Sequence, residues 1–275
     1  MKHDTIRGLG LFALFALILA LGLRYGDGVI RRFHLDSPVR PLPVLMYHAV
    51  APDGTENLEE TQVTVSKLRR DLEYLQKAGY TTVLPRELLS GEPLPEKIVL
   101  LTFDDGYQNN YDLLFPLLRE YGMKAVLSPV VSLTDQEAEG YCTWAMLREM
   151  DASGLVEIGS HTYALHNLEN HGMAYPAGEA NGIQRRRGES REAFQARVPE
   201  DLRRSYERLT QELGRPPVCF AYPFGTVEPE AQGVLDALFP VSLTTRSGIG
   251  DLARGTRRLP RITMAMGKDL PGILP

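Results

Sequence analysis

Short apolar runs alternate with helical patterns through most of this chain, and this alternation restricts the fold more than any other feature. Apolar runs at residues 44–48, 98–103 and 124–131 predict strands that are covered on both faces. Helical patterns lie between them, with apolar side chains on one face at 66–78 and at 111–121. Repeated units of this kind are typical of a parallel sheet or barrel.

The same patterns continue toward the carboxyl end. Further strands are expected at residues 81–84, 156–159, 219–222, 241–245 and 259–263, and further helices at 144–152 and 199–213. Residues 167–198 are polar and have no clear period, so we expect a loop insertion there. Six or seven strand–helix units indicate an α/β fold, either a barrel or an open sheet.

The amino terminus is different in kind. Residues 8–23 contain no polar side chain and end at Arg24, slightly short of the ~20 apolar residues that span a bilayer. We expect residues 1–23 to form an apolar membrane-anchoring helix. Ala20-Leu21-Gly22 leaves a cleaved signal peptide as the alternative. Residues 24–42 are rich in Arg, Gly and Pro and are expected to be a linker, so the folded domain is placed at residues 43–275.

Composition narrows the class of partner. The 275 residues carry a formal net charge of −5, which gives no overall attraction to a polyphosphate, so a nucleic-acid partner is not expected. Cys142 and Cys219 are too few for a disulfide scaffold or a four-cysteine zinc site. They leave open a single bridge in an oxidising compartment.

Two groups of metal-ligating residue types directly follow predicted strands. Asp104 and Asp105 directly follow the apolar strand at 98–103. Neighbouring carboxylates at the end of a buried strand repel each other, which is costly unless a metal or another cation stabilises them. His161 and His166 follow the strand at 156–159. Strand carboxyl ends meet at one edge of a parallel sheet, and two imidazoles with a carboxylate suit zinc, cobalt, nickel or iron. Taken singly, each group also fits a turn or a helix cap.

A third group, Tyr222-Pro-Phe-Gly225, ends the predicted strand at 219–222. Such a turn can direct a backbone N–H into a site and supply an aromatic wall, although most turns of this type are only turns. We expect Pro223 and Phe224 to contact substrate. Tyr107 and Tyr163 are candidates for further aromatic contacts with substrate, with simple packing as the alternative.

The order of these motifs resembles the polysaccharide deacetylases, also called the NodB-homology or carbohydrate esterase 4 family. The motifs that carry the resemblance are Tyr47-His48, Thr102-Phe-Asp-Asp-Gly106, Ser160-His-Thr-Tyr-Ala-Leu-His166, Tyr222-Pro-Phe-Gly225 and Leu259-Pro-Arg-Ile262. They are most similar to the branch that de-N-acetylates poly-β-1,6-N-acetylglucosamine. The resemblance implies a distorted (β/α)7 barrel and one divalent metal ion held by Asp105, His161 and His166, with Asp104 as catalytic base.

Two positions depart from the broader family. Many members take the catalytic acid from a histidine near the carboxyl end, whereas no histidine follows His171 here, so we assign this role to His48. A backbone-bonded structural histidine is the alternative for His48. Many members also carry an arginine that orients the base, but Ala221 stands at that position. Arg261 is our candidate for this role, and an arginine paired elsewhere on the rim is the alternative.

These residues support amide hydrolysis. A metal with three protein ligands activates water and polarises an acetyl carbonyl, Asp104 accepts a proton, and the Tyr107 N–H completes the oxyanion site. The expected partner is an acetylated amino-sugar polysaccharide. We expect the protein to act outside the cytoplasmic membrane, either anchored to it or secreted. Peptidoglycan, chitin-like oligomers or an O-acetylated glycan are alternative substrates, and a saccharide-binding module is the non-enzymatic alternative.

Overall fold

The structure is a computed structural model that describes residues 39–166, 182–186, 188–226 and 228–274. The chain divides into two units, one formed by residues 1–40 with 251–255 and the other by residues 41–250 with 256–275. The second unit contains the described strands and helices except for η5 (Leu252–Arg254) and the last residue of β11 (Gly250–Asp251). The predicted membrane helix at residues 1–23 and most of the predicted linker lie outside the described residues.

Most of the described strands are short, and β6 and β10 are the longest. The strands are β1 (Pro41–Leu42), β2 (Val44–Tyr47), β3 (Val50–Ala51), β4 (Val63–Thr64), β5 (Thr81–Thr82), β6 (Ile98–Asp105), β7 (Ala125–Pro129), β8 (Val156–Ile158), β9 (Cys219–Ala221), β10 (Val241–Ser247), β11 (Gly250–Asp251) and β12 (Leu259–Thr263). All eight residues of β6 are buried, as its continuous apolar sequence predicts.

The helices lie between these strands. They are α2 (Val65–Lys77), α3 (Pro85–Leu89), α4 (Phe115–Tyr121), α5 (Val131–Asp135), α6 (Trp144–Ala152), α7 (Arg191–Leu213) and α8 (Gln232–Leu238). A π-helical turn, η1 (Asn110–Leu114), precedes α4, and 3-10 turns occur at η3 (Pro223–Gly225), η4 (Pro229–Ala231), η5 (Leu252–Arg254) and η6 (Leu270–Gly272).

The main sheet is parallel and nearly closes into a barrel. Its strand order is β8-β7-β6-β2-β12-β10-β9, with β5 added beside β6. The two ends meet just beyond β8, where the Ser160 N–H donates to the Cys219 carbonyl (2.9 Å) and the Ala221 N–H donates to the Ser160 carbonyl (2.9 Å). Seven strands therefore form the ring, which confirms the predicted α/β barrel.

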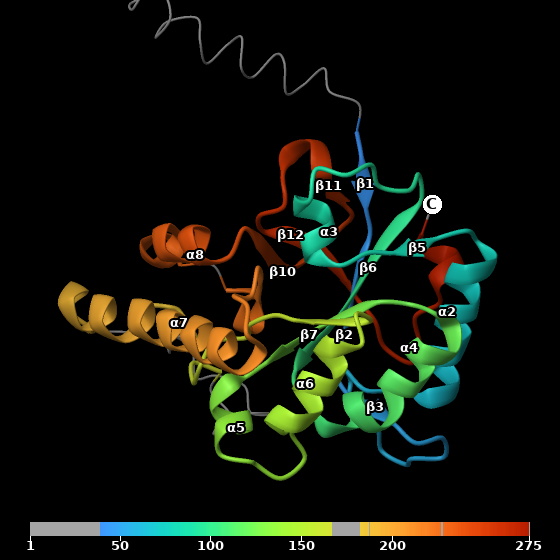
Figure 1. Cartoon of the computed structure of the whole chain (residues 1–275), viewed down its shortest axis with the longest axis horizontal. Coiled ribbons are helices and arrows are strands. Elements are labelled where there is room, and N and C mark those ends of the chain that lie inside the picture. The colour runs from blue at the N-terminus through green and yellow to red at the C-terminus, as the bar shows by residue number, and fades with distance from the viewer. Residues whose placement is uncertain (1–38, 167–181, 187, 227, 275) are drawn as a thin grey trace, which may run out of the picture. The chain divides into compact units, whose positions relative to one another are not determined.

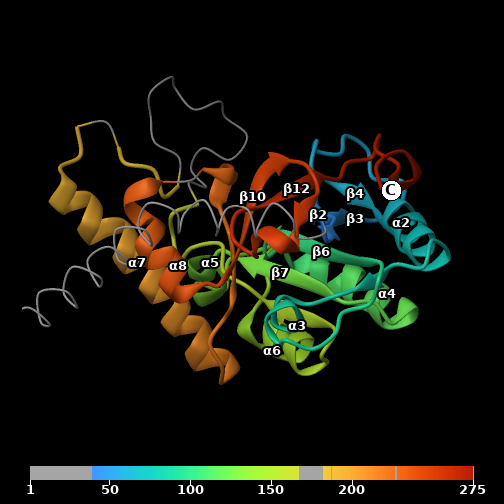
Figure 2. The same cartoon turned by 90° about the horizontal axis from the view of Figure 1, so that it is seen from above.

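Helices cover the outside of this ring. In both views α2 and α4 lie on one side of the sheet and α7 and α8 on the other (Figures 1 and 2). The larger core packs α2, α4 and α6 against the strands, and a second core lies under α7 and α8. Helix α2 illustrates why the helices pack on the sheet, because Leu68, Leu72 and Leu75 on one of its faces are all fully buried. The Thr64 side chain caps its first turn by accepting the Lys67 N–H.

The prediction for residues 191–213 was wrong at its amino end. We expected a loop to residue 198 and a helix from Pro199, because proline favours the first turn of a helix. Helix α7 instead begins at Arg191, with Pro199 inside it. The Ser190 side chain caps its start by accepting the Ala193 N–H (3.1 Å), and buried Phe194 packs its first turns. This burial offsets the hydrogen bond that Pro199 cannot make.

Smaller differences concern short elements. The strand predicted to reach residue 131 ends at Pro129, and residues 131–135 form α5. Helices α3 and α8 were not predicted, because segments of five and seven residues show too little periodicity. Cys142 and Cys219 are buried free thiols. None of the described helices is long and apolar enough to cross a membrane.

Candidate active site

Asp105, His161 and His166 lie together at the carboxyl edge of the barrel. One ligand atom from each residue lies within 4.8 Å of the others, and all three side chains are buried. The Nε2 atoms of both histidines lie 3.4 Å from Asp105 Oδ1. The structure thus brings Asp105 to two histidines that lie more than fifty residues after it in the sequence.

The end of β6 directs Asp105 toward this cluster. Asp105 has a left-handed backbone conformation (φ 73°), and so does Gly106 after it (φ 83°). A Cβ atom at position 106 would lie 2.6 Å from the Cβ of Pro129, so only glycine fits. A non-glycine residue at positive φ is costly, and such strain is often found where a side chain must be aimed at a site.

The ring of His161 is fixed by the backbone. Its Nδ1 lies 2.8 Å from the Ala221 carbonyl oxygen, which can only accept, so Nδ1 carries the proton. The unprotonated Nε2 therefore faces Asp105, as in histidines whose second nitrogen orients the ring at a metal.

A divalent cation fits this donor set. Asp105 Oδ1 is buried, and no described side chain donates a hydrogen bond to it. A buried carboxylate oxygen without a donor is costly, and a cation between it and two imidazole nitrogens would satisfy it. The cluster is a possible Asp/His/His metal site, and its donors do not specify which metal it takes.

Asp104 is held by Arg261. The guanidinium donates from Nη1 to Oδ1 (2.9 Å) and from Nη2 to Oδ2 (2.7 Å), and both side chains are buried. Arg261 also donates to the Thr102 hydroxyl (3.2 Å) and to the Thr244 carbonyl (2.8 Å). Burial favours a raised pKa for Asp104, but Arg261, together with the nearby His161 and His48, lowers it below its ordinary value.

His48 lies just beyond β2 and faces the same carboxylates. Burial lowers the pKa of His48, while the charges of Asp104 and Asp105 oppose this shift. Its Nδ1 is buried and has no hydrogen-bond partner among the described residues. A purely structural histidine would bond to the backbone through this nitrogen, and the described residues show no such bond.

Tyr107 and Phe224 flank the cluster. Tyr107 stacks on Tyr141 with ring centroids 5.2 Å apart. The backbones of Tyr107 and Tyr141 form an antiparallel bridge whose hydrogen bonds are made by the residues on either side of them. The Tyr107 N–H therefore points away from Tyr141. Phe224 also has positive φ (57°), is 39% exposed, and packs on the His166 ring at 4.7 Å.

Pro223 and Tyr163 occupy different settings. Pro223 is buried at the start of η3, the turn that presents Phe224. Arg204 lies over the Tyr163 ring at 3.7 Å and donates to its hydroxyl (2.7 Å). One face of Tyr163 is therefore already covered.

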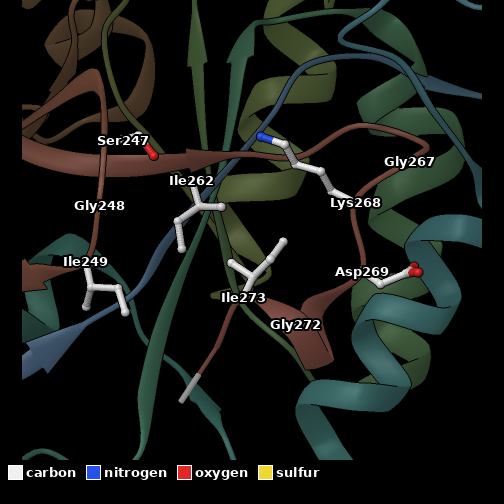
Figure 3. Close-up of a pocket in the computed structure, with 9 residues that line it drawn as sticks. All are labelled: Ser247, Gly248, Ile249, Ile262, Gly267, Lys268, Asp269, Gly272 and Ile273. Carbon is white, nitrogen blue, oxygen red and sulfur yellow. The ribbon is translucent and has the colours of Figure 1, made fainter.

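A pocket of about 480 Å³ lies elsewhere on the same unit. It is lined by residues 247–249, Ile262 and residues from the 267–273 segment (Figure 3). None of the predicted site residues lines it. Ile262 and Ile273 lie in the middle of the view, the Lys268 side chain extends toward Ile262, and the Asp269 side chain points away from both (Figure 3).

Two residues that contact the site were not anticipated. Asp201 and Ser205 on α7 bond to the segment that carries both histidines. No motif marks either residue. Their only signal in the sequence is four-residue spacing, which places them on one helix face.

Comparison with known proteins identifies the family. The polysaccharide deacetylase family matches residues 91–238, more than half of the chain. This chain belongs to the polysaccharide deacetylase family. The matched segment includes Asp104, Asp105 and both histidine ligand candidates, whereas His48 and Arg261 lie outside it.

Individual relatives extend the similarity. The poly-β-1,6-N-acetyl-D-glucosamine N-deacetylase of Escherichia coli K12 is 30% identical over 231 residues, which cover 76% of this chain and 34% of that protein. The chain thus spans about a third of the length of this relative.

Two solved structures have the same fold. A de-N-acetylase from Aggregatibacter actinomycetemcomitans superposes with a TM-score of 0.73 at 26% identity, over 85% of this chain and 98% of that one. IcaB from Ammonifex degensii gives a TM-score of 0.66 at 27% identity, over 82% and 92% of the two chains. These matches confirm the predicted family and its barrel.

Proposed function

We propose that this chain is a metal-dependent hydrolase that removes N-acetyl groups from an extracellular amino-sugar polymer, namely poly-β-1,6-N-acetylglucosamine. The observation that carries the proposal is the cluster of Asp105, His161 and His166 beside an aspartate held by a buried arginine. The similarity to the Escherichia coli poly-β-1,6-N-acetyl-D-glucosamine N-deacetylase supports the choice of substrate. Since that polymer is extracellular, we place the protein outside the cytoplasm, with the apolar amino terminus as its membrane anchor.

Asp105, His161 and His166 would hold the divalent ion. When bound, the ion supplies Lewis-acid chemistry, which polarises the acetyl carbonyl and lowers the pKa of water. The two-point bond from Arg261 keeps Asp104 ionised and fixes its orientation, and only an ionised carboxylate can accept the proton of the attacking water.

His48 would donate the proton to the departing amine. Burial lowers its pKa, so the protonated ring is a stronger acid than free imidazolium. The Tyr107 N–H, directed away from Tyr141, would donate to the oxyanion of the tetrahedral intermediate. Phe224, exposed beside His166, would pack on the sugar ring.

Acetate release tests the proposal. The substrates are N-acetylated β-1,6-glucosamine oligomers and, in parallel, chitin oligomers and peptidoglycan fragments. We expect release from the β-1,6 oligomers after reconstitution with zinc, cobalt or nickel, and loss of release with a chelator. Asp104→Asn should lower kcat about 100-fold or more, because it removes the proton acceptor.

Asp112→Asn is the matched control, because Asp112 is an exposed carboxylate a short distance along the chain. It should retain normal activity. Full activity in Asp104→Asn, or no acetate from any acetylated glycan with any of the three metals, would contradict the proposal. Release from chitin oligomers or peptidoglycan alone would reassign the substrate.

A further inference from the structure

One carboxylate on α7 binds the loop that carries both histidine ligand candidates. Asp201 accepts the Tyr163 N–H at Oδ1 and the Ala164 N–H at Oδ2, each at 2.8 Å. These two amides lie midway between His161 and His166. A carboxylate that accepts one N–H at each oxygen fixes both the position and the direction of the peptide between them.

A second contact comes from the same face of α7. Ser205 lies four residues after Asp201, is fully buried, and its hydroxyl bonds to that of Ser160. The Ser160 hydroxyl in turn accepts the Thr162 N–H (3.2 Å). Helix α7 therefore contacts the ligand loop on both sides of His161.

The loop needs external support because its own conformation is unfavourable. Thr162 has positive φ (74°), which is rare for a β-branched residue. On the opposite side, the first N–H groups of α5 bind the loop carbonyls, Val131 to Thr162 (3.2 Å) and Ser132 to Tyr163 (2.8 Å). The loop is thus held between α5 and α7, which lie side by side in Figure 1 and contact each other.

Helix α7 is a firm support for such contacts. It runs from Arg191 to Leu213, begins with a Ser190 cap and ends at Gly214 in a left-handed conformation. Phe194, Leu202 and Leu209 bury its inner face. Asp201 and Ser205 therefore have little freedom to move relative to the barrel.

We infer that Asp201 and Ser205 are positioning residues, which hold the loop so that His161 and His166 face Asp105 with the spacing a divalent metal requires. The inference rests on the proposed metal site. Groups that orient metal ligands without touching the metal typically contribute 10- to 100-fold to metal affinity. The larger effect is expected from Asp201, which makes two bonds, and the smaller from Ser205.

The test is a zinc titration of the full chain in competition with a chromophoric chelator. Asp201→Asn keeps the shape of the side chain but replaces one acceptor oxygen by a donor, so one loop N–H loses its partner. We expect the zinc Kd of this variant to rise about 10- to 100-fold. Ser205→Ala should raise the Kd by less, and it serves as the second variant if Asp201→Asn does not fold.

Glu200→Gln is the control, because Glu200 is the preceding residue on α7 and its side chain is 72% exposed. Its zinc Kd should equal that of the unmodified protein. A lowered Tm in both positioning variants with a zinc Kd unchanged from the control would overturn the inference, since that result describes a purely structural role. Failure of the unmodified chain to bind zinc would instead contradict the proposed metal site, so the two failures are distinguishable.

Discussion

At the scale of single residues, Asp104 depends on the planar shape of the Arg261 guanidinium as well as on its positive charge. The guanidinium reaches both carboxylate oxygens and also bonds to Thr102 and Thr244. A lysine ammonium is a point charge that cannot reproduce this planar geometry. The pair is buried, so any donor that is lost cannot be replaced by bulk water.

Arg261→Lys should therefore lower kcat/KM about 100-fold, because a small displacement of Asp104 is enough to misalign it with the substrate. Steady-state acetate release measures the effect. Arg257→Lys is the control, because Arg257 is a half-exposed arginine close by in sequence that pairs with Asp236. Equal activity of the two variants would show that Asp104 does not depend on the two-point bond.

At the scale of elements, a buried ion pair within α2 accepts a hydrogen bond from β2, the strand that leads to His48. Lys67 Nζ lies 2.6 Å from both oxygens of Asp71, and the Tyr47 hydroxyl donates to the same carboxylate (2.9 Å). All three side chains are almost completely buried. Removal of one partner leaves an uncompensated charge, whereas replacement of both partners by apolar groups does not.

Lys67→Met should lower the free energy of unfolding by about 3–5 kcal/mol. The double variant Lys67→Met/Asp71→Leu should recover part of that loss, because it removes the uncompensated charge but leaves the buried Tyr47 hydroxyl without its acceptor. Urea denaturation followed by circular dichroism measures both. The same helix offers a control at the same spacing: Glu73 and Lys77 form an exposed pair, so Lys77→Met should change stability by about 0.5 kcal/mol or less. A similar small effect for Lys67→Met would show that the buried pair contributes no more than the exposed one.

At the scale of the whole molecule, a carboxyl inside the barrel makes global stability depend on pH. Burial raises the pKa of Glu157 to about 7, and the Arg86 N–H and guanidinium offset this only in part. The unfolded chain releases this proton near the ordinary pKa of glutamate. Between these two values the folded state binds more protons, so stability decreases as pH rises.

Between pH 5 and pH 8 this group alone should lower the free energy of unfolding by about 3 kcal/mol. Glu157→Gln should remove most of that slope, since glutamine does not titrate. Urea denaturation of the metal-free protein across this range measures it. Glu92→Gln, at an exposed glutamate, is the control and should leave the slope unchanged. An unchanged slope in Glu157→Gln would show that another group is responsible.

Much of this protein could be predicted from local patterns. The apolar run at 98–103, the leucines of α2 and the order of the site motifs each reflect a short-range requirement, either burial on both faces or a turn at a strand end. The apolar patterns were sufficient for an α/β fold, either a barrel or an open sheet. The family resemblance carried by the motif order implied the barrel and the cluster of Asp105, His161 and His166. The roles of these residues stay predictions until the experiments above are done.

Only the tertiary structure decided which distant residues meet. Ser190 is a local sign of a helix start at Arg191, but only the packing of Phe194 shows that the helix continues through Pro199. Nor does the sequence show that Asp201 binds the histidine loop, since that contact joins residues 37 and 38 positions apart in the sequence. The sequence by itself determined the elements and the chemistry of their ends, because both depend on near neighbours. The structure decided the supporting contacts, because these depend on how the elements pack.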